Sequence, residues 1–194
     1  MILLKKIRVE RGEEGFSFFE LMVVIALIAI VSAISYPYFL DMKGRYRLKA
    51  AARDVFSSLQ VNKMEAVKTS TVVAVFFDDA TSSYRVCHNR NVDWRNANDH
   101  DCEQAVPLDS AVSFSRGTVL TKPDNTSNSD DIEYIDDIVG FFQDGTGFES
   151  DQTRISGTRY VYLSSLNSPE VYAVGVNRVG LVQLFVWTQG SGWQ

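Results

Sequence analysis

The stretch Gly15-Phe16-Ser17-Phe18-Phe19-Glu20 leads directly into an apolar run, Leu21 to Phe39, that is long enough to cross a membrane. Glu20 is the only charged residue between Phe16 and Leu40. An ionised side chain inside a bilayer costs about 2.5 to 3.5 kcal/mol on insertion scales, so such a residue usually has a partner. We therefore expect a cation from another chain, or from a new amino terminus made by cutting between Gly15 and Phe16.

This segment resembles the class III signal of type IV pilins and type II secretion pseudopilins, over residues 15 to about 40. The resemblance implies that a membrane-bound aspartyl prepilin peptidase cuts after Gly15 and methylates the new amine on Phe16. Glu20 would then be the fifth residue of the mature chain, and Pro37 would occupy a position where many pilins carry proline. An α-amine titrates at about pH 8, so the Phe16 amine would stay largely cationic at neutral pH and could pair with Glu20 of a neighbouring subunit.

Two other interpretations of the same segment stay open at this point. A Sec signal peptide has an apolar core of about 7 to 15 residues and a small-residue cleavage site. Here the run is longer, and its one weak cleavage candidate, Ala33-Ile34-Ser35, precedes a tyrosine and a proline. An ordinary single-span anchor fits the length but leaves Glu20 unexplained. Basic residues lie on both sides of the run, so only the family resemblance indicates a cytoplasmic leader, residues 1–15.

Beyond the apolar run the sequence keeps a helical period and becomes amphipathic. We expect one helix from Phe16 to about Lys68, with 16–40 as its transmembrane and polymerisation half and 41–68 as its amphipathic half. Pro37 removes a backbone donor and predicts a bend there; the alternative is that it ends one helix. Residues at spacings of three and four define the expected inner face: Leu48, Ala52, Val55, Phe56, Leu59, Lys63, Ala66 and Val67.

Residues 69–194 are expected to form a β-rich globular head. Gly, Asn, Asp and Pro separate its apolar runs, which favours an antiparallel sandwich or a pair of sheets packed against the amphipathic half of the helix. The predicted fold class is therefore α+β. The runs lie near residues 70–77, 82–87, 111–119, 138–142, 158–163, 170–177 and 180–187. Aromatic residues in these strands are expected to be mainly core: Tyr160, Tyr162, Tyr172, Phe185 and Trp187.

Three further segments resemble the GspH, FimT and FimU group of minor pseudopilins and minor pilins. They are the helix-to-strand junction within 51–75, the strand and Asp-Gly turn of 139–147, and the final hairpin within 171–184. The resemblance implies a pilin-like fold, a single span in the inner membrane and a periplasmic head. At the last turn the group often has Gly-Arg-Val, where this chain has Gly180-Leu181-Val182.

Cys87 and Cys102 are the only cysteines, and they flank a polar loop. In the extracytoplasmic head that the resemblance implies, we expect a disulfide that closes this loop and contributes about 3 kcal/mol. A zinc site that adds His88 and His100 is the alternative. Its ligand spacing matches no familiar zinc finger, and an oxidising compartment works against it.

Composition and motifs favour a structural protein over an enzyme. The formal net charge of −5 gives no electrostatic footprint for nucleic acid. The sequence contains no Gly-x-Ser-x-Gly, His-Glu-x-x-His or phosphate-loop motif, and we expect no cofactor and no metal ligand. One acidic run could supply oxygen ligands to calcium, but it lacks EF-hand spacing, so we expect a solvated loop. It comprises Asp130, Asp131, Glu133, Asp136 and Asp137.

The leading interpretation is a minor pseudopilin or pilin, a structural subunit of a type II secretion pseudopilus or a type IV pilus. Its partners would be prepilin peptidase, other pilins or pseudopilins, the assembly platform and membrane lipid. One alternative is a minor pilin that binds DNA for uptake, although the acidic balance opposes it. The other is an uncleaved membrane-anchored sensor or binding domain, which predicts that residues 1–15 are retained and that Glu20→Gln is tolerated.

Overall fold

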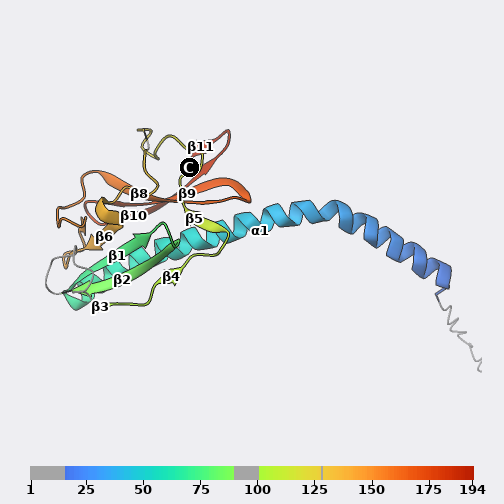
Figure 1. The fold of residues 1–194 in the computed structure, drawn as a ribbon, viewed down its shortest axis with the longest axis horizontal. Helices are drawn as coiled ribbons and strands as arrows, with labels where there is room; N and C mark the ends of the chain where they lie inside the picture. Colours follow the sequence, from blue (N-terminus) through green and yellow to red (C-terminus); the bar gives the residue numbers. More distant parts are fainter. Residues whose placement is uncertain (1–15, 90–100, 128) are drawn as a thin grey trace, which may run out of the picture. The chain divides into compact units, whose positions relative to one another are not determined.

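The structure is a computed structural model, and it describes residues 16–89, 101–127 and 129–194. A long helix comes first, and short strands follow it (Figure 1). The elements are α1 (Phe18–Thr69), β1 (Val72–Asp78), β2 (Ser83–Asn89), β3 (Asp101–Cys102), β4 (Val106–Pro107), β5 (Val112–Phe114), the 3-10 helix η1 (Ile135–Asp137), β6 (Ile138–Phe141), β7 (Gly147–Phe148), β8 (Thr158–Ser165), β9 (Ser168–Asn177), β10 (Val182–Thr188) and β11 (Gly192–Trp193).

The chain divides into two compact units, Met1–Phe39 and Leu40–Gln194. The described part of the first unit consists of Phe16, Ser17 and the first 22 residues of α1, up to Phe39. The second unit contains the rest of α1 and every strand. The predicted helix of 16–68 is therefore confirmed to within two residues, and α1 continues without interruption through position 37.

The strands of the second unit form two sheets in which all pairings are antiparallel. The first sheet has the order β3-β2-β1-β6-β7, with β4 also paired to β2. The second sheet has the order β11-β10-β9-β8-β5. The predicted α+β class, with a long helix ahead of a pair of antiparallel sheets, is confirmed.

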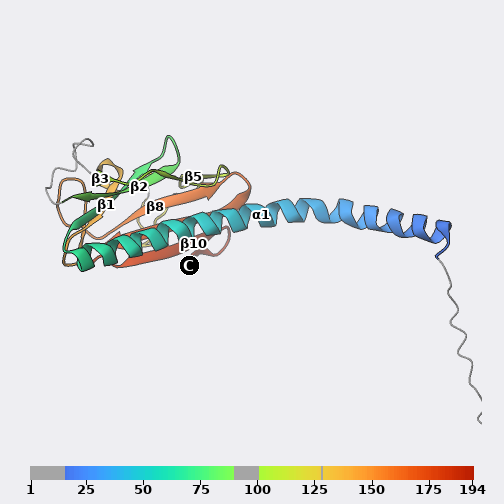
Figure 2. The ribbon, with the colours of Figure 1, turned by 90° about the horizontal axis from the view of Figure 1, so that it is seen from below.

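The main core lies between the second part of α1 and both sheets, along which the helix runs (Figure 2). Leu48, Ala52, Val55 and Leu59 are at most 1% exposed and share one cluster with residues from both sheets. The spacing of these residues, four, three and four, repeats close to the 3.6-residue turn of the helix, so they stay on one face. The amphipathic pattern thus predicted which face of α1 packs against the strands.

Near its end the inner face of α1 differs from the prediction. Val67 is 49% exposed, and Lys63 is only half-buried. Asn62 is buried instead, and its side-chain amide donates a hydrogen bond to Ser58 Oγ at 3.2 Å. A polar residue is tolerated there because its donor has a partner. Val67 lies beside Gly145 in the turn between β6 and β7, where half of its surface stays open.

The predicted strand at 111–119 is shorter than expected, because β5 ends at Phe114. The chain turns immediately afterwards: Gly117 has a positive φ of 57°, and the Val119 N–H donates to the Arg116 carbonyl at 3.1 Å. Val119 is nevertheless buried, in a second cluster on the far side of β8 and β9. An apolar residue in this run therefore marks core and not strand.

Two glycine turns bring the sheets together at one end of the second unit. The predicted Asp-Gly turn lies between β6 and β7, where Gly145 has a φ of 77°. The turn between β9 and β10 contains Gly180, with a φ of 69°. A Cβ on Gly180 would meet the Gly145 carbonyl oxygen, so the two backbones approach closely at this point. The Gly147 N–H also donates to the Arg178 carbonyl at 3.1 Å, which links the two sheets directly.

The strand aromatics are mostly core, as predicted. Tyr160, Tyr162 and Tyr172 are at most 7% exposed, and Phe185 and Trp187 are half-buried. Tyr172 belongs to the main core with α1, whereas Tyr160 and Tyr162 lie in the second cluster. The C-terminal strand β11 completes that cluster, because Trp193 packs there and its indole N–H donates to the Thr121 carbonyl at 2.8 Å.

Candidate functional site

The N-terminal end of α1 carries the residues that the sequence marks for processing and assembly. Phe16 is 80% exposed, and Glu20 lies exposed in the first turn of α1. Gly15, together with the rest of the predicted leader, lies outside the described residues. Phe16 thus lies just before α1 and Glu20 lies in its first turn, and both side chains are exposed and open to contact.

Ser17 caps this helix end. Its hydroxyl oxygen accepts the Phe19 N–H at 3.3 Å, and its carbonyl accepts the Leu21 N–H at 3.1 Å. Ser17 and Glu20 have the Ser-x-x-Glu spacing of a capping box, in which the fourth residue is Glu or Gln. A carboxylate in the first turn also complements the positive end of the helix dipole. Sequence reasoning missed this position of Glu20 at the helix start, although the Ser-x-x-Glu pattern was visible.

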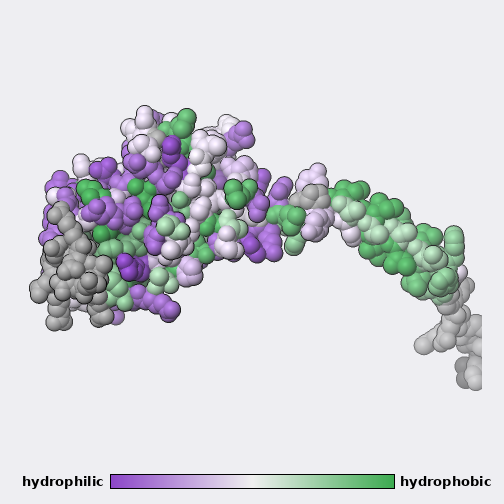
Figure 3. Space-filling view, in the orientation of Figure 1, coloured by the Kyte–Doolittle hydropathy of each residue, from purple (hydrophilic) through white to green (hydrophobic). Residues whose placement is uncertain are grey.

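Residues Phe18–Tyr36 of α1 form a 19-residue stretch with a mean hydropathy of 2.6, none of it buried by the rest of the chain. At 1.5 Å per residue this stretch is about 28 Å long, close to the thickness of the hydrocarbon core of a bilayer. Hydrophobic side chains cover the face of this stretch that Figure 3 shows, and Glu20 is its one charged residue. A helix that is apolar on all sides needs lipid or other apolar helices around it.

The region of the predicted bend at Pro37 remains helical. Ser35 donates its hydroxyl to the Val31 carbonyl at 2.9 Å, an i to i−4 bond of a kind that can bend a helix. The bend itself stays a prediction.

Cys87 and Cys102 stand directly opposite each other on β2 and β3, and their sulfurs are bonded. His88 follows on β2, with its ring nitrogens 3.9 Å from a Glu65 oxygen and 3.5 Å from a Glu103 oxygen. The second histidine of the zinc alternative, His100, lies outside the described residues. Since both sulfurs are in the disulfide, neither cysteine is a thiolate that could hold zinc.

The acidic run is divided among separate partners. Asp131 accepts the Arg116 N–H at 2.8 Å, and Asp136 accepts the Ser150 hydroxyl at 2.6 Å. Glu133 accepts the Lys122 ammonium at 3.1 Å and the Tyr162 hydroxyl at 2.7 Å. Asp137 faces Asp79, Asp136 and Asp78, and burial together with these charges raises the pKa of its carboxyl. Within the part of the chain that the structure describes, no three His, Cys, Asp or Glu residues are grouped closely enough to hold a metal ion.

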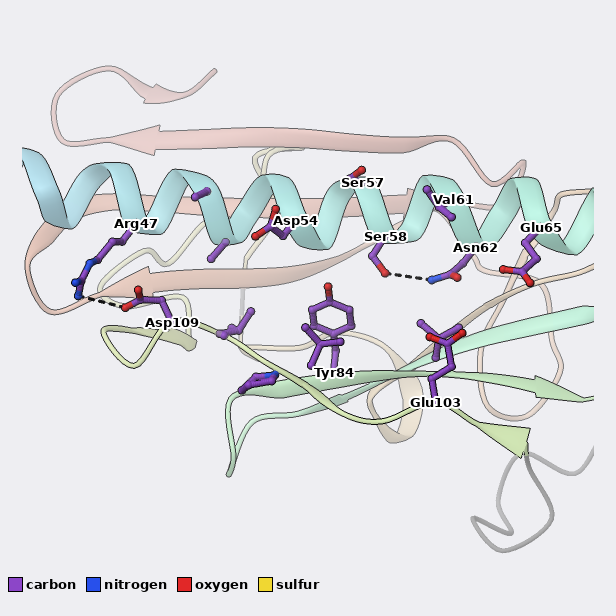
Figure 4. A pocket seen from close by; sticks show the side chains of 16 residues that line it. Arg47, Asp54, Ser57, Ser58, Val61, Asn62, Glu65, Tyr84, Glu103 and Asp109 are labelled. Atoms are coloured by element: carbon purple, nitrogen blue, oxygen red, sulfur yellow. Dashed lines mark hydrogen bonds and ion pairs between the residues drawn. The ribbon is translucent and has the colours of Figure 1, made fainter.

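The second unit contains a groove of 650 Å³ between α1, β2 and the segment that includes β4 (Figure 4). Sequence reasoning missed it, because its walls come from segments far apart in the chain. Its one lining cation, Arg47, makes an ion pair with Asp109 at 3.5 Å. The other charged lining residues are all acidic: Asp54, Glu65 and Glu103. This excess of carboxylates gives the groove the same sign as a phosphate backbone, so it does not suit nucleic acid.

Comparison with known proteins bears directly on the N-terminal segment. A family model described as the prokaryotic N-terminal methylation motif matches residues 11–36, which include Gly15, Phe16 and Glu20. Comparison with curated proteins finds no match. Among solved structures, the minor pseudopilin EpsH from the Type 2 Secretion System of Vibrio cholerae is similar, with 12% sequence identity and a TM-score of 0.42. That alignment covers 71% of this chain and 94% of EpsH.

The chain therefore matches a known family over residues 11–36. It carries the N-terminal methylation motif on a long apolar helix, and the same helix continues into a unit of two antiparallel sheets.

Proposed function

We propose that this protein is a minor pseudopilin or minor pilin, a structural subunit of a type II secretion pseudopilus or a type IV pilus. The observation that carries the proposal is the methylation motif at 11–36, which begins before a 19-residue apolar helix and contains Gly15 at the expected cleavage position. Prepilin peptidase cuts after Gly15 and methylates the amine of Phe16. The protein works by assembly and not as an enzyme.

The apolar helix has two successive environments in this proposal. Before assembly, Phe18–Tyr36 spans the inner membrane and the second unit lies in the periplasm. During assembly, the same apolar surface packs against the helices of neighbouring pilins or pseudopilins. Because the surface is apolar all round, it can be covered by lipid or by several neighbours without a change in structure.

Glu20 sets the position of the subunit in the fibre. An unpaired carboxylate in hydrocarbon costs about 2.5 to 3.5 kcal/mol, and a cationic amine from a neighbour removes that cost. The exposed Phe16 amine of the next subunit supplies this cation after cleavage. Pairing is possible at one axial offset only, so the charge pair fixes the register that apolar packing leaves free.

The test is the amino terminus of the protein recovered from membranes. Intact mass and amino-terminal sequencing are measured in cells with an active prepilin peptidase and in cells with an inactive one. We expect a chain that begins at methylated Phe16 only when the peptidase is active. A chain that retains residues 1–15 in both strains, or one cut near Ser35, would contradict the proposal and favour an uncleaved anchor or a secreted protein.

A further inference from the structure

We propose that the end of the second unit near Gly44 binds the surface of an anionic phospholipid bilayer before the subunit is assembled. This inference rests on the proposed function, because it requires that Phe18–Tyr36 spans the membrane. The contact residues are Lys43, Arg45, Tyr46 and Lys49 on α1 and Leu166 in the turn between β8 and β9, which we call the Gly44 patch.

The turn between β8 and β9 packs directly against α1 at Gly44. A Cβ on Gly44 would lie 2.6 Å from the Asn167 carbonyl oxygen, so only glycine allows this approach without movement of the turn. The preceding residue, Leu166, is fully exposed, with a relative accessibility of 105%. An exposed apolar residue thus lies at the tip of the β8–β9 hairpin, next to the residue whose backbone contacts the helix at Gly44.

Chain geometry places this turn close to the membrane. Gly44 follows Tyr36, the last residue of the apolar span, by eight residues of α1. Eight helical residues rise about 12 Å at most, whatever direction the helix takes between them. The headgroup layer on each side of a bilayer is roughly 5 to 7 Å thick. Gly44 and the turn that rests on it therefore lie at the headgroups or within a few ångströms of them.

The charges of this helix segment suit an anionic surface. Residues 41–53 contain five cations, Lys43, Arg45, Arg47, Lys49 and Arg53, and one acid, Asp41, in a chain whose net charge is −5. Lys43, Arg45, Tyr46 and Lys49 are all exposed, and Arg45, Tyr46 and Lys49 border a cavity of 260 Å³.

Acidic residues of the strands and loops face the same segment. Glu170 pairs with Arg45, and Asp109 pairs with Arg47, each at 3.5 Å. Lys43 and Lys49, in contrast, form no ion pair with any residue in the described ranges, so their charge remains for an external partner. A Lys near an anionic surface attracts it, and its long side chain can reach back along the helix toward the headgroups.

The experiment uses the full chain reconstituted in vesicles, with an environment-sensitive fluorophore on Leu166→Cys. Only the introduced cysteine is labelled, because Cys87 and Cys102 are bonded to each other. The vesicles contain either phosphatidylethanolamine with phosphatidylglycerol, or phosphatidylcholine alone. We expect the label at 166 to report lipid contact in the anionic vesicles and water in the neutral ones. A label on Val179→Cys, an exposed valine in the turn between β9 and β10, should report water in both.

Charge variants identify the residues that make the contact. Each of the substitutions Lys43→Gln and Lys49→Gln should lower the ratio of lipid-contacting to free label by about fivefold. The matched control, Lys68→Gln, removes one charge near the other end of the helix and should leave that ratio unchanged. Lys43, Lys49 and Lys68 are all exposed on α1, so the three variants should fold alike.

Flotation of the vesicles distinguishes a failure of membrane anchoring from a failure of the Gly44 patch to bind lipid. If the chain does not float with the vesicles, membrane anchoring fails and this inference falls with it. If the chain floats and the label at 166 stays in water, the Gly44 patch does not bind lipid, while the proposed function stands. An equal loss of contact in the Lys68→Gln control would also overturn the inference.

Discussion

Two proposed contributions of Glu20, to the helix end and to assembly, can be separated by a single substitution. Its position in the first turn has the capping-box spacing from Ser17, and the proposed pairing with a neighbouring amine uses its charge. Glutamine can close a capping box as well, but it carries no charge. The side chain's contribution to the helix end and its contribution to assembly are therefore distinguishable at this one residue.

We predict that Glu20→Gln is processed like the wild type but enters the fibre much less. Loss of the charge pair removes the register signal, while the cap on α1 is kept. The measurement is the amount of the variant in sheared or cross-linked fibres relative to its amount in membranes. Assembly of Glu20→Gln at the wild-type level would show that the cap, and not the charge, is what Glu20 supplies.

Gly180 illustrates a residue whose backbone conformation and surroundings both require glycine. We predict that Gly180→Ala destabilises the second unit by about 1 to 2 kcal/mol more than Gly157→Ala. Both residues have positive φ, 69° and 77°, so both variants carry the backbone strain of about 1 to 2 kcal/mol. Only at Gly180 does the new Cβ also meet the Gly145 carbonyl, whereas nothing lies within 4 Å at Gly157.

The measurement is the free energy of unfolding by urea in mild detergent, followed by tryptophan fluorescence. Equal losses at the two glycines would show that the turn containing Gly145 moves aside without cost.

At the scale of elements, the helix offers a matched pair for testing which face packs. The sequence predicts that Val55 and Val67 are both core, but their exposed fractions are 1% and 49%. We predict that Val55→Ala costs about 2 kcal/mol of unfolding free energy, from lost burial and the cavity left behind. Val67→Ala should change it by less than about 0.5 kcal/mol. Urea unfolding of both variants checks this, and a similar cost for the two would contradict the assigned face.

The elements with strong local signals could be predicted from sequence. The period of 3.6 persists through the second part of α1, and the apolar runs at β1, β8 and β9 are long enough to identify as strands. Strands of two residues, such as β3 and β11, could not be predicted. They exist because a neighbouring strand offers a partner, and no local pattern records that partner.

The order of the strands in the sheets and the groove could not be predicted from local sequence patterns either. β1 pairs with β6, although the paired residues, from Phe76 with Ile138 to Val73 with Phe141, are far apart in the sequence and no local pattern records the pairing. The groove borders α1, β2 and the segment of β4, three parts whose proximity exists only after folding. The candidate processing site, by contrast, lies within six consecutive residues, so its pattern was visible in the sequence itself.

At the scale of the whole molecule, the buried tyrosines make stability sensitive to alkaline pH. Burial raises the pKa of the Tyr162 hydroxyl, and its hydrogen bond to the Glu133 carboxylate raises it further. Burial also raises the pKa of the hydroxyls of Tyr84, Tyr134, Tyr160 and Tyr172. Above about pH 10 an unfolded tyrosine loses its proton, while a folded one of this kind keeps it. The folded state then binds more protons, so stability is full below pH 10 and falls as pH rises above it.

We predict that Tyr162→Phe reduces this fall by about 1.4 kcal/mol per pH unit, the effect of one proton. The variant should be less stable than the wild type at neutral pH, because the hydrogen bond to Glu133 is lost. Urea unfolding at a series of pH values from 8 to 11.5 gives both slopes. Parallel slopes for the two proteins would show that Tyr162 titrates alike in the folded and unfolded chain.

The continuity of α1 has a mechanical consequence. One helix belongs to both units, and its residues Leu48 to Ala66 form the core with both sheets. A force applied to the apolar segment, as when a fibre is pushed or pulled, enters the second unit at Leu40. Pulled along its axis, the helix slides against the sheets, so its buried contacts over roughly 27 Å resist together and do not peel one by one. The packing that stabilises the fold would therefore also resist extraction of α1 from the sheets by force.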